Sequence, residues 1–325
     1  MGVHESMPKR SFLAIGLFLI FAFLFLACNA NERIPENGEA LKVVATTTIV
    51  GDVVAQVGGE HINLSVLLPV GADPHSFSPT PQNIASVAEA DLVFANGVGL
   101  EEFLEPLIES AGAQEKIIYL SDNLELLAQP IKPGLVEEDH TVEDAGNQHL
   151  GVDPHAWVDP NNVIQWVKTI EQQLSSTDPK NAASYQANAE NYRTELQNLD
   201  AWIREQVAQI PPENRKLVTD HTLFGYFADE YGFEQVGALI PGYSTLAEPS
   251  AQELAAMEES IASLDVHAIF VGNTVNPALA ERVAADTGTQ LIYVYTGSLS
   301  EPGGEADSYL AYMRYNTTAF VKALK

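Results

Sequence analysis

Short β-branched runs alternate with helical segments along most of this chain, and this alternation restricts the possible folds more than any other feature. Expected strands lie at residues 42–48, 61–69, 92–96, 216–219, 268–271 and 291–295. Expected helices lie at residues 49–57, 81–90, 224–231, 251–263, 278–285 and 308–324. Strands that alternate with helices form parallel sheets covered by those helices. The sequence therefore predicts an α/β protein with two lobes, each built on a mainly parallel sheet.

The longest predicted helix, at residues 178–210, separates these two groups of strands. Its apolar and aromatic positions recur every three or four residues, as on one face of a helix: Tyr185, Ala189, Tyr192, Leu196, Leu199 and Ile203. Asp178 suits the N-cap and Pro179 the first helical position. A helix of about 50 Å is longer than a small domain is wide. We interpret it as a rigid rod between the lobes, with a coiled-coil dimer as the alternative.

These elements define the expected domain organisation. An N-terminal lobe at residues 41–177 precedes the linking helix at 178–210, and a C-terminal lobe at 211–325 follows it. At 325 residues the chain is long enough for two lobes with cores of their own.

The N-terminus reads as a targeting segment. Lys9 and Arg10 precede an apolar run that ends at Cys28, the single cysteine of the chain. A basic start followed by an apolar run predicts a signal peptide at 1–28, and a cysteine at this position resembles a lipidation site. The run is about 16 residues, shorter than the roughly 20 of a membrane-spanning helix, although an uncleaved anchor is the alternative. We expect residues 29–40 to be a tether and the body to lie outside the cytoplasm, periplasmic or anchored as a lipoprotein.

The charge balance indicates the kind of partner. The chain has 16 basic and 44 acidic residues, a net charge of −28 at neutral pH. Nucleic acids and anionic membranes bind basic surfaces, so neither is an expected partner, and any membrane contact is expected only through the lipid anchor. Cations are favoured, although an acidic surface also simply promotes solubility.

A repeated motif supplies candidate metal ligands. Residues 71–75 and 151–155 both read Gly-x-Asp-Pro-His, with an aromatic residue two positions later, and a third histidine, His221, follows another aspartate. A single histidine after a turn is usually just polar surface, but a repeat on two separate loops is not expected by chance. We predict that His75, His155 and His221 bind one metal ion.

The neighbouring aspartates fit the same interpretation. Imidazole suits zinc and also manganese, iron, copper and nickel. A carboxylate that accepts the other ring N–H fixes the orientation of a ligating histidine. Asp73, Asp153 and Asp220 are candidates for this supporting role.

An acidic stretch precedes the second motif. Residues 137–149 contain several carboxylates together with His140 and His149. This stretch is either a solvated surface loop or a loop that captures metal ions beside His155.

Beyond these patterns, the sequence resembles a known family, the zinc-type metal-binding lipoproteins of zinc and manganese ABC importers. The resemblance covers most of the chain after the N-terminal segment. It is carried by residues 71–75, 152–157, 221–232, 248–250, 307–310 and 313–316. It implies two α/β lobes joined by one long rigid helix, with the metal ion held in the cleft between the lobes.

The resemblance also implies a ligand set. His75, His155 and His221 match the first three ligand positions, and a histidine at the third position is the zinc-type pattern. The family's fourth ligand, an aspartate, is replaced here by Gly297, and another frequent acid is replaced by Asn273. The fourth position is left open to water or to one of several side chains: Asp220, Glu248, Glu301 or Asn273. Restoring the acid with Gly297→Asp is expected to tighten binding.

The function implied by this resemblance is capture of a divalent cation outside the cytoplasm, most readily Zn²⁺ with Mn²⁺ as an alternative, by a monomer. The partners would be an ABC permease and its ATPase. The alternatives are a metal-dependent adhesin or storage lipoprotein, and a three-histidine zinc hydrolase. No His-Glu-x-x-His or Gly-x-Ser-x-Gly motif occurs in the chain, so we expect a binding protein and not an enzyme.

Overall fold

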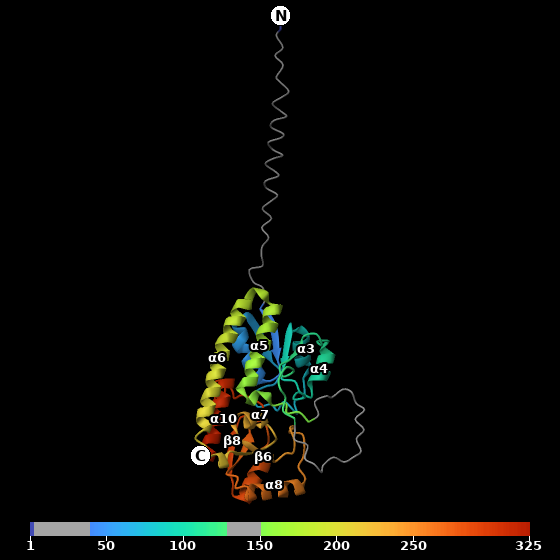
Figure 1. Cartoon of the computed structure of the whole chain (residues 1–325). Coiled ribbons are helices and arrows are strands. Elements are labelled where there is room, and N and C mark those ends of the chain that lie inside the picture. The colour runs from blue at the N-terminus through green and yellow to red at the C-terminus, as the bar shows by residue number, and fades with distance from the viewer. Residues whose placement is uncertain (3–39, 129–150) are drawn as a thin grey trace. The chain divides into compact units, whose positions relative to one another are not determined.

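The computed structural model describes residues 1–2, 40–128 and 151–325, and the described residues from Ala40 onward form one compact unit (Figure 1). The predictions for Cys28, His140 and His149, and for the leader and tether, fall outside the described residues. Within the described ranges, no helix is both long and apolar enough to cross a membrane.

Each half of the compact unit contains a four-stranded sheet. The N-terminal sheet has the order β2-β1-β3-β4 and the C-terminal sheet the order β6-β5-β7-β8, and all the neighbouring strands run parallel. The strands are β1 (Leu41–Ala45), β2 (Ile62–Val66), β3 (Leu92–Ala95), β4 (Ile117–Tyr119), β5 (Lys216–Thr219), β6 (Glu234–Ala238), β7 (Ala268–Gly272) and β8 (Gln290–Val294). The predicted pair of parallel α/β lobes is confirmed.

Helices connect the strands of both lobes. They are α2 (Thr48–Gly58), α3 (Pro81–Glu89), α4 (Leu104–Ala111), α5 (Pro160–Thr177), α6 (Ala182–Val207), α7 (Gly225–Tyr231), α8 (Ala251–Ser263), α9 (Ala278–Thr287) and α10 (Tyr309–Leu324). Side-chain caps begin several of them: Thr80 and Ser250 each accept a hydrogen bond from the amide three residues on. The sequence patterns did not predict β4, β6, α4 or α5. An Asp-Pro pair marks the start of α5, where Asp159 accepts from the Asn161 amide.

The long helix α6 has the buried face that the sequence predicts, from Tyr185 to Val207. It begins later than expected, because residues Pro179–Asn181 form a separate 3₁₀ turn. Asp178 does not cap the helix with its side chain. Instead, its Oδ2 accepts hydrogen bonds from Asn181 Nδ2 at 2.7 Å and from the Tyr185 hydroxyl at 2.9 Å.

Helix α6 packs against α2 and α5 of the N-terminal lobe and against α10 of the C-terminal lobe (Figure 1). The largest hydrophobic cluster includes Val43 and Phe94 from the first sheet and Phe270 from the second. The lobes therefore share one core along α6. The exact boundaries at residues 177–178 and 210–211 stay a prediction.

Candidate metal centre

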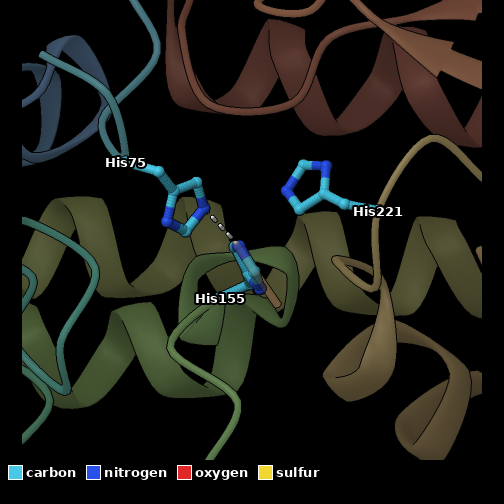
Figure 2. Close-up of side chains that lie close together, drawn as sticks. All are labelled: His75, His155 and His221. Carbon is cyan, nitrogen blue, oxygen red and sulfur yellow. Dashed lines mark hydrogen bonds between the residues drawn. The ribbon is translucent and has the colours of Figure 1, made fainter. Parts of the chain in front are cut away.

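Three buried histidines that are far apart in the sequence come together in the structure (Figure 2). His75 lies on the loop between β2 and α3, His155 just before α5, and His221 just after β5. One nitrogen from each ring lies within 4.8 Å of the others. His75 Nε2 and His155 Nε2 are 3.2 Å apart. The rings are 5%, 0% and 2% exposed in that order, so the group is shielded from bulk water.

An aspartate shapes each histidine-bearing turn. Asp73 Oδ1 accepts a hydrogen bond from the His75 amide at 3.0 Å, and Asp153 Oδ1 accepts one from the His155 amide at 2.9 Å. These bonds from a side chain to the amide two residues on are Asx turns. The repeated Asp-Pro-His motif is thus a local folding unit that presents the ring of its last residue.

Two of the three rings also have a carboxylate on their other nitrogen. His155 Nδ1 donates to Asp153 Oδ1 at 2.8 Å, and His221 Nδ1 donates to Asp220 Oδ1. Both rings therefore direct Nε2 into the group, and His221 Nε2 is buried with no hydrogen-bond partner. This is the arrangement that carboxylates give to ligating histidines.

Asp73 differs from Asp153 and Asp220. Besides the His75 amide, it accepts hydrogen bonds from the hydroxyls of Ser76 and of Thr245, which lies on the other lobe. No bond to the His75 ring is present among these contacts. Asp73 therefore positions the backbone of its turn and links the two lobes.

Burial sets the protonation of the site. It lowers the pKa of His75 to about 3, helped by the nearby His155 and His221 rings, and it lowers the pKa of His155 well below its usual value. Burial also raises the pKa of Asp153 to about 7, and a cation nearby would favour its charged form. At neutral pH, His75 and His155 are uncharged, which is the form that binds metals.

None of the other candidate ligands belongs to the group of three histidines. Glu248 and Glu301 are exposed, and among the described His, Cys, Asp and Glu side chains only the three histidines form such a group. Asn273 is engaged with the turn after β8: its Nδ2 donates to Ser298 O at 3.2 Å and its Oδ1 accepts from Thr296 N at 3.0 Å. Asp220 is engaged as well, because its Oδ2 accepts from the amide of Gly272.

Gly297 lies against the turn that carries the first histidine. A Cβ atom at this position would lie 2.8 Å from Pro74 Cδ, closer than such atoms pack. Beside it, Gly71 N donates to Ser298 Oγ at 2.8 Å, so the two lobes meet here. The expected gain from Gly297→Asp therefore requires Pro74 to move first.

Several aromatic residues around the site were not singled out as site residues from the sequence. The Trp157 ring lies 5.2 Å from the His155 ring, and its Nε1 donates to the Tyr312 hydroxyl at 3.1 Å. That hydroxyl donates in turn to Thr296 O at 3.0 Å. Tyr243 lies 6.2 Å from the His155 ring. The motif already contained Trp157, whereas nothing in the sequence pattern marked Tyr243.

The donor set fits a divalent transition-metal ion. In a tetrahedral zinc site, bonds of about 2.0–2.1 Å place ligand nitrogens roughly 3.3–3.4 Å apart, and the observed 3.2 Å between His75 and His155 is close to this spacing. The three buried imidazoles, two of them with a carboxylate behind the ring, form a donor set suited to such an ion.

Two parallel α/β lobes with this trio of imidazoles define a receptor for metal ions. Residues 43–323 match the sequence model of one protein family, the zinc-uptake complex component A, periplasmic (ZnuA). The chain belongs to this family. It is therefore a metal-binding protein of an ABC importer, with a permease and an ATPase as partners, and not an enzyme.

Relatives and solved structures agree with this assignment. The manganese-binding lipoprotein MntA of Halalkalibacterium halodurans is 33% identical over 310 residues, which cover 95% of this chain and 97% of the relative. The manganese ABC transporter substrate-binding lipoprotein PsaA of Streptococcus pneumoniae is 30% identical, with the same shares covered. The periplasmic zinc-binding protein TroA of Treponema pallidum superimposes with a TM-score of 0.76 at 26% identity, over 88% of this chain and 99% of TroA.

Proposed function

We propose that His75, His155 and His221 hold one divalent cation through their Nε2 atoms and that the protein passes this ion to its permease. The observation that supports this most is the convergence of three buried imidazole nitrogens within 4.8 Å. Two of these rings are backed by a carboxylate. His75 and His155 belong to the N-terminal lobe and His221 follows β5 of the C-terminal lobe, so both lobes contribute to the site.

We further infer that zinc is the preferred ion. Relatives are named for manganese and a similar structure for zinc, so relatedness leaves the choice open. The donor set favours zinc, because imidazole nitrogen suits zinc whereas manganese favours carboxylate and water oxygen. The described His, Cys, Asp and Glu side chains place no carboxylate in the group of three. Water would complete a four-coordinate zinc ion.

Competitive titration of the full chain with zinc and manganese tests both statements. We expect saturable one-to-one binding, with zinc displacing manganese. His155→Ala should weaken zinc binding at least about tenfold, or about 1.4 kcal/mol. His267→Ala is the control, because His267 is half-exposed and its ion-pair contact is with Asp265, outside the group. Tighter binding of manganese would refute the zinc preference, and unchanged binding in His155→Ala would refute the site.

We also propose that the protein acts outside the cytoplasm, anchored by a lipid on Cys28. The relatives named above are lipoproteins, and Cys28 follows an apolar run. Expression of the wild type and of Cys28→Ser in a bacterium fed labelled fatty acid tests this proposal. Label is expected in the wild type alone, and equal labelling of both would contradict it.

A further inference from the structure

Two consecutive carbonyl groups just before His155 accept hydrogen bonds from different lobes. The carbonyl of Asp153 accepts a hydrogen bond from Tyr226, on α7 of the C-terminal lobe, at 2.9 Å. The carbonyl of Pro154 accepts one from Asn96 Nδ2, at the end of β3 in the N-terminal lobe, also at 2.9 Å. Neither Asn96 nor Tyr226 belongs to the group of three histidines.

Tyr226 connects the His155 loop to the element that follows His221. Its hydroxyl also accepts from Leu127 N at 3.1 Å, and Asp153 N donates to Leu127 O at 2.8 Å. The hydroxyl is thus part of a closed set of hydrogen bonds around Asp153. Because α7 begins shortly after His221, Tyr226 joins the backbone before His155 to the segment that carries His221.

Close packing supports the same connection. A Cβ atom on Gly225, the first residue of α7, would collide with Asp153 Oδ2. The carboxylate that orients the His155 ring therefore rests against the backbone of α7. The carboxylate that orients the His155 ring and the backbone just before His155 are therefore both in contact with a helix of the opposite lobe.

Asn96 is fixed on the other side. It is fully buried, and its Nδ2 donates to Gly97 O as well as to Pro154 O, both at 2.9 Å. The backbone N–H of Asn96 donates to Oε1 of the buried Glu101 at 2.8 Å. The N-terminal lobe thus holds the Pro154 carbonyl through Asn96, a residue that is itself fixed by hydrogen bonds.

We propose that Asn96 and Tyr226 are positioning residues that align His155 with the other two ligands only when the two lobes are correctly placed. This inference rests on the proposed function, because it assigns residues that support the same metal site. It predicts that removing one hydroxyl on α7 weakens metal binding although Tyr226 does not touch the ion.

The test is zinc titration of the full chain carrying Tyr226→Phe, which removes both hydrogen bonds and keeps the ring. We expect zinc affinity to fall about tenfold and zinc release to a chelator to become faster. The matched control is Tyr185→Phe, which removes the hydroxyl of a fully buried tyrosine that bonds Asp178, outside the site. It should leave zinc affinity and release unchanged.

A second pair tests the N-terminal side. Asn96→Ala should also weaken zinc binding and speed release, whereas Asn188→Ala should not, because Asn188 Nδ2 bonds Val57 O away from the histidines. Thermal unfolding of every variant separates a loss of stability from a loss of alignment. Affinity and release rates equal to those of the wild type in both Tyr226→Phe and Asn96→Ala would overturn the inference, even if both variants unfold at lower temperature.

These outcomes are distinct from failure of the proposed function. If the wild type itself does not bind zinc or manganese one-to-one, the metal site is refuted. If the wild type binds and His155→Ala does not, the site stands, and the Tyr226 and Asn96 variants alone decide the inference.

Discussion

The two lobes have the same strand order but use a buried carboxylate differently. In the N-terminal lobe, Glu101 joins the ends of β1 and β3: it accepts from Thr46 Oγ1 at 2.6 Å and from the amides of Asn96 and Gly97 at 2.8 and 3.0 Å. In the C-terminal lobe, Asp220 joins the ends of β5 and β7 by accepting from the Gly272 amide. Asp220 also accepts from the His221 ring.

The difference shows how the lobes supply ligands that are held in different ways. His221 follows β5 almost directly, and a carboxylate holds its ring. In the N-terminal lobe, Asp153 holds the ring of His155 in the same way. His75 lies on a longer loop after β2, and its aspartate binds the backbone instead. His75 is therefore expected to be the adjustable ligand, and His221 a fixed one.

The largest expected effect comes from removing one ligand on each side. His221→Ala and His75→Ala should each weaken zinc binding at least about tenfold, or about 1.4 kcal/mol. His221→Ala should cost more, because its ring is already oriented when the ion arrives. Calorimetric titration checks this order. A larger loss of zinc affinity in His75→Ala would contradict the view that His221 is a fixed ligand and His75 an adjustable one.

Next in size is the contrast between the two carboxylates. Asp220→Asn should weaken zinc binding about 10- to 100-fold, because an amide no longer supports the ring as a carboxylate does. Glu101→Gln should instead lower the free energy of unfolding by about 1–3 kcal/mol, because an amide nitrogen would face a buried backbone N–H. Its effect on zinc affinity should be much smaller. Zinc titration and chemical denaturation of both variants measure these two effects. Equal losses of zinc affinity in Asp220→Asn and Glu101→Gln would contradict the prediction.

A smaller effect is expected where the lobes touch beside His75. Gly297→Ala places a Cβ atom against Pro74 and should weaken zinc binding a few-fold by displacing the adjustable ligand. Gly237→Ala is a suitable control, because its Cβ would meet only the flexible end of Met257, outside the site. A zinc affinity in Gly297→Ala as high as in the wild type would show that the His75 loop moves freely.

The last prediction concerns the pH dependence of folding stability and has the smallest expected effect on zinc binding. Burial raises the pKa of Asp159 from 3.8 to about 6, and the nearby Glu230 and Asp200 add to the shift. The folded protein therefore binds this proton more tightly than the unfolded chain, and stability should decrease as the pH rises from about 4 to about 6. Asp159→Asn keeps a side chain that can cap α5 and should flatten this slope in denaturation curves. An unchanged slope would contradict the assignment to Asp159.

Much of the fold follows from local sequence patterns. The β-branched runs and the spacing of apolar residues in α6 were sufficient to predict two parallel α/β lobes and the face of the long helix. Helix α5 was missed although an Asp-Pro pair, shortly after the second histidine motif, marks its start. The start of α6 was placed too early because the Asp178 side chain bonds Tyr185, a contact that exists only after folding.

Part of the site could also be predicted from local sequence patterns. The Asp-Pro-His repeat is a local unit that singled out two histidines, and the aspartate before His221 added the third; the fold then brings all three together. The contact between Gly297 and Pro74 and the hydrogen bonds of Tyr226 join segments far apart in the chain. No spacing in the sequence reveals them, and only the packing of the two lobes creates them.

The short contact between His75 and His155 bears on how cargo leaves. Asp153 accepts the Nδ1 proton of His155, so the Nε2 atom of that ring has a lone pair. At 3.2 Å this lone pair can accept a hydrogen bond from His75 Nε2 in one tautomer of His75, whereas an ion bound to both rings would require the other tautomer. The hydrogen bond between the rings and a bound ion would therefore compete for the same two nitrogens.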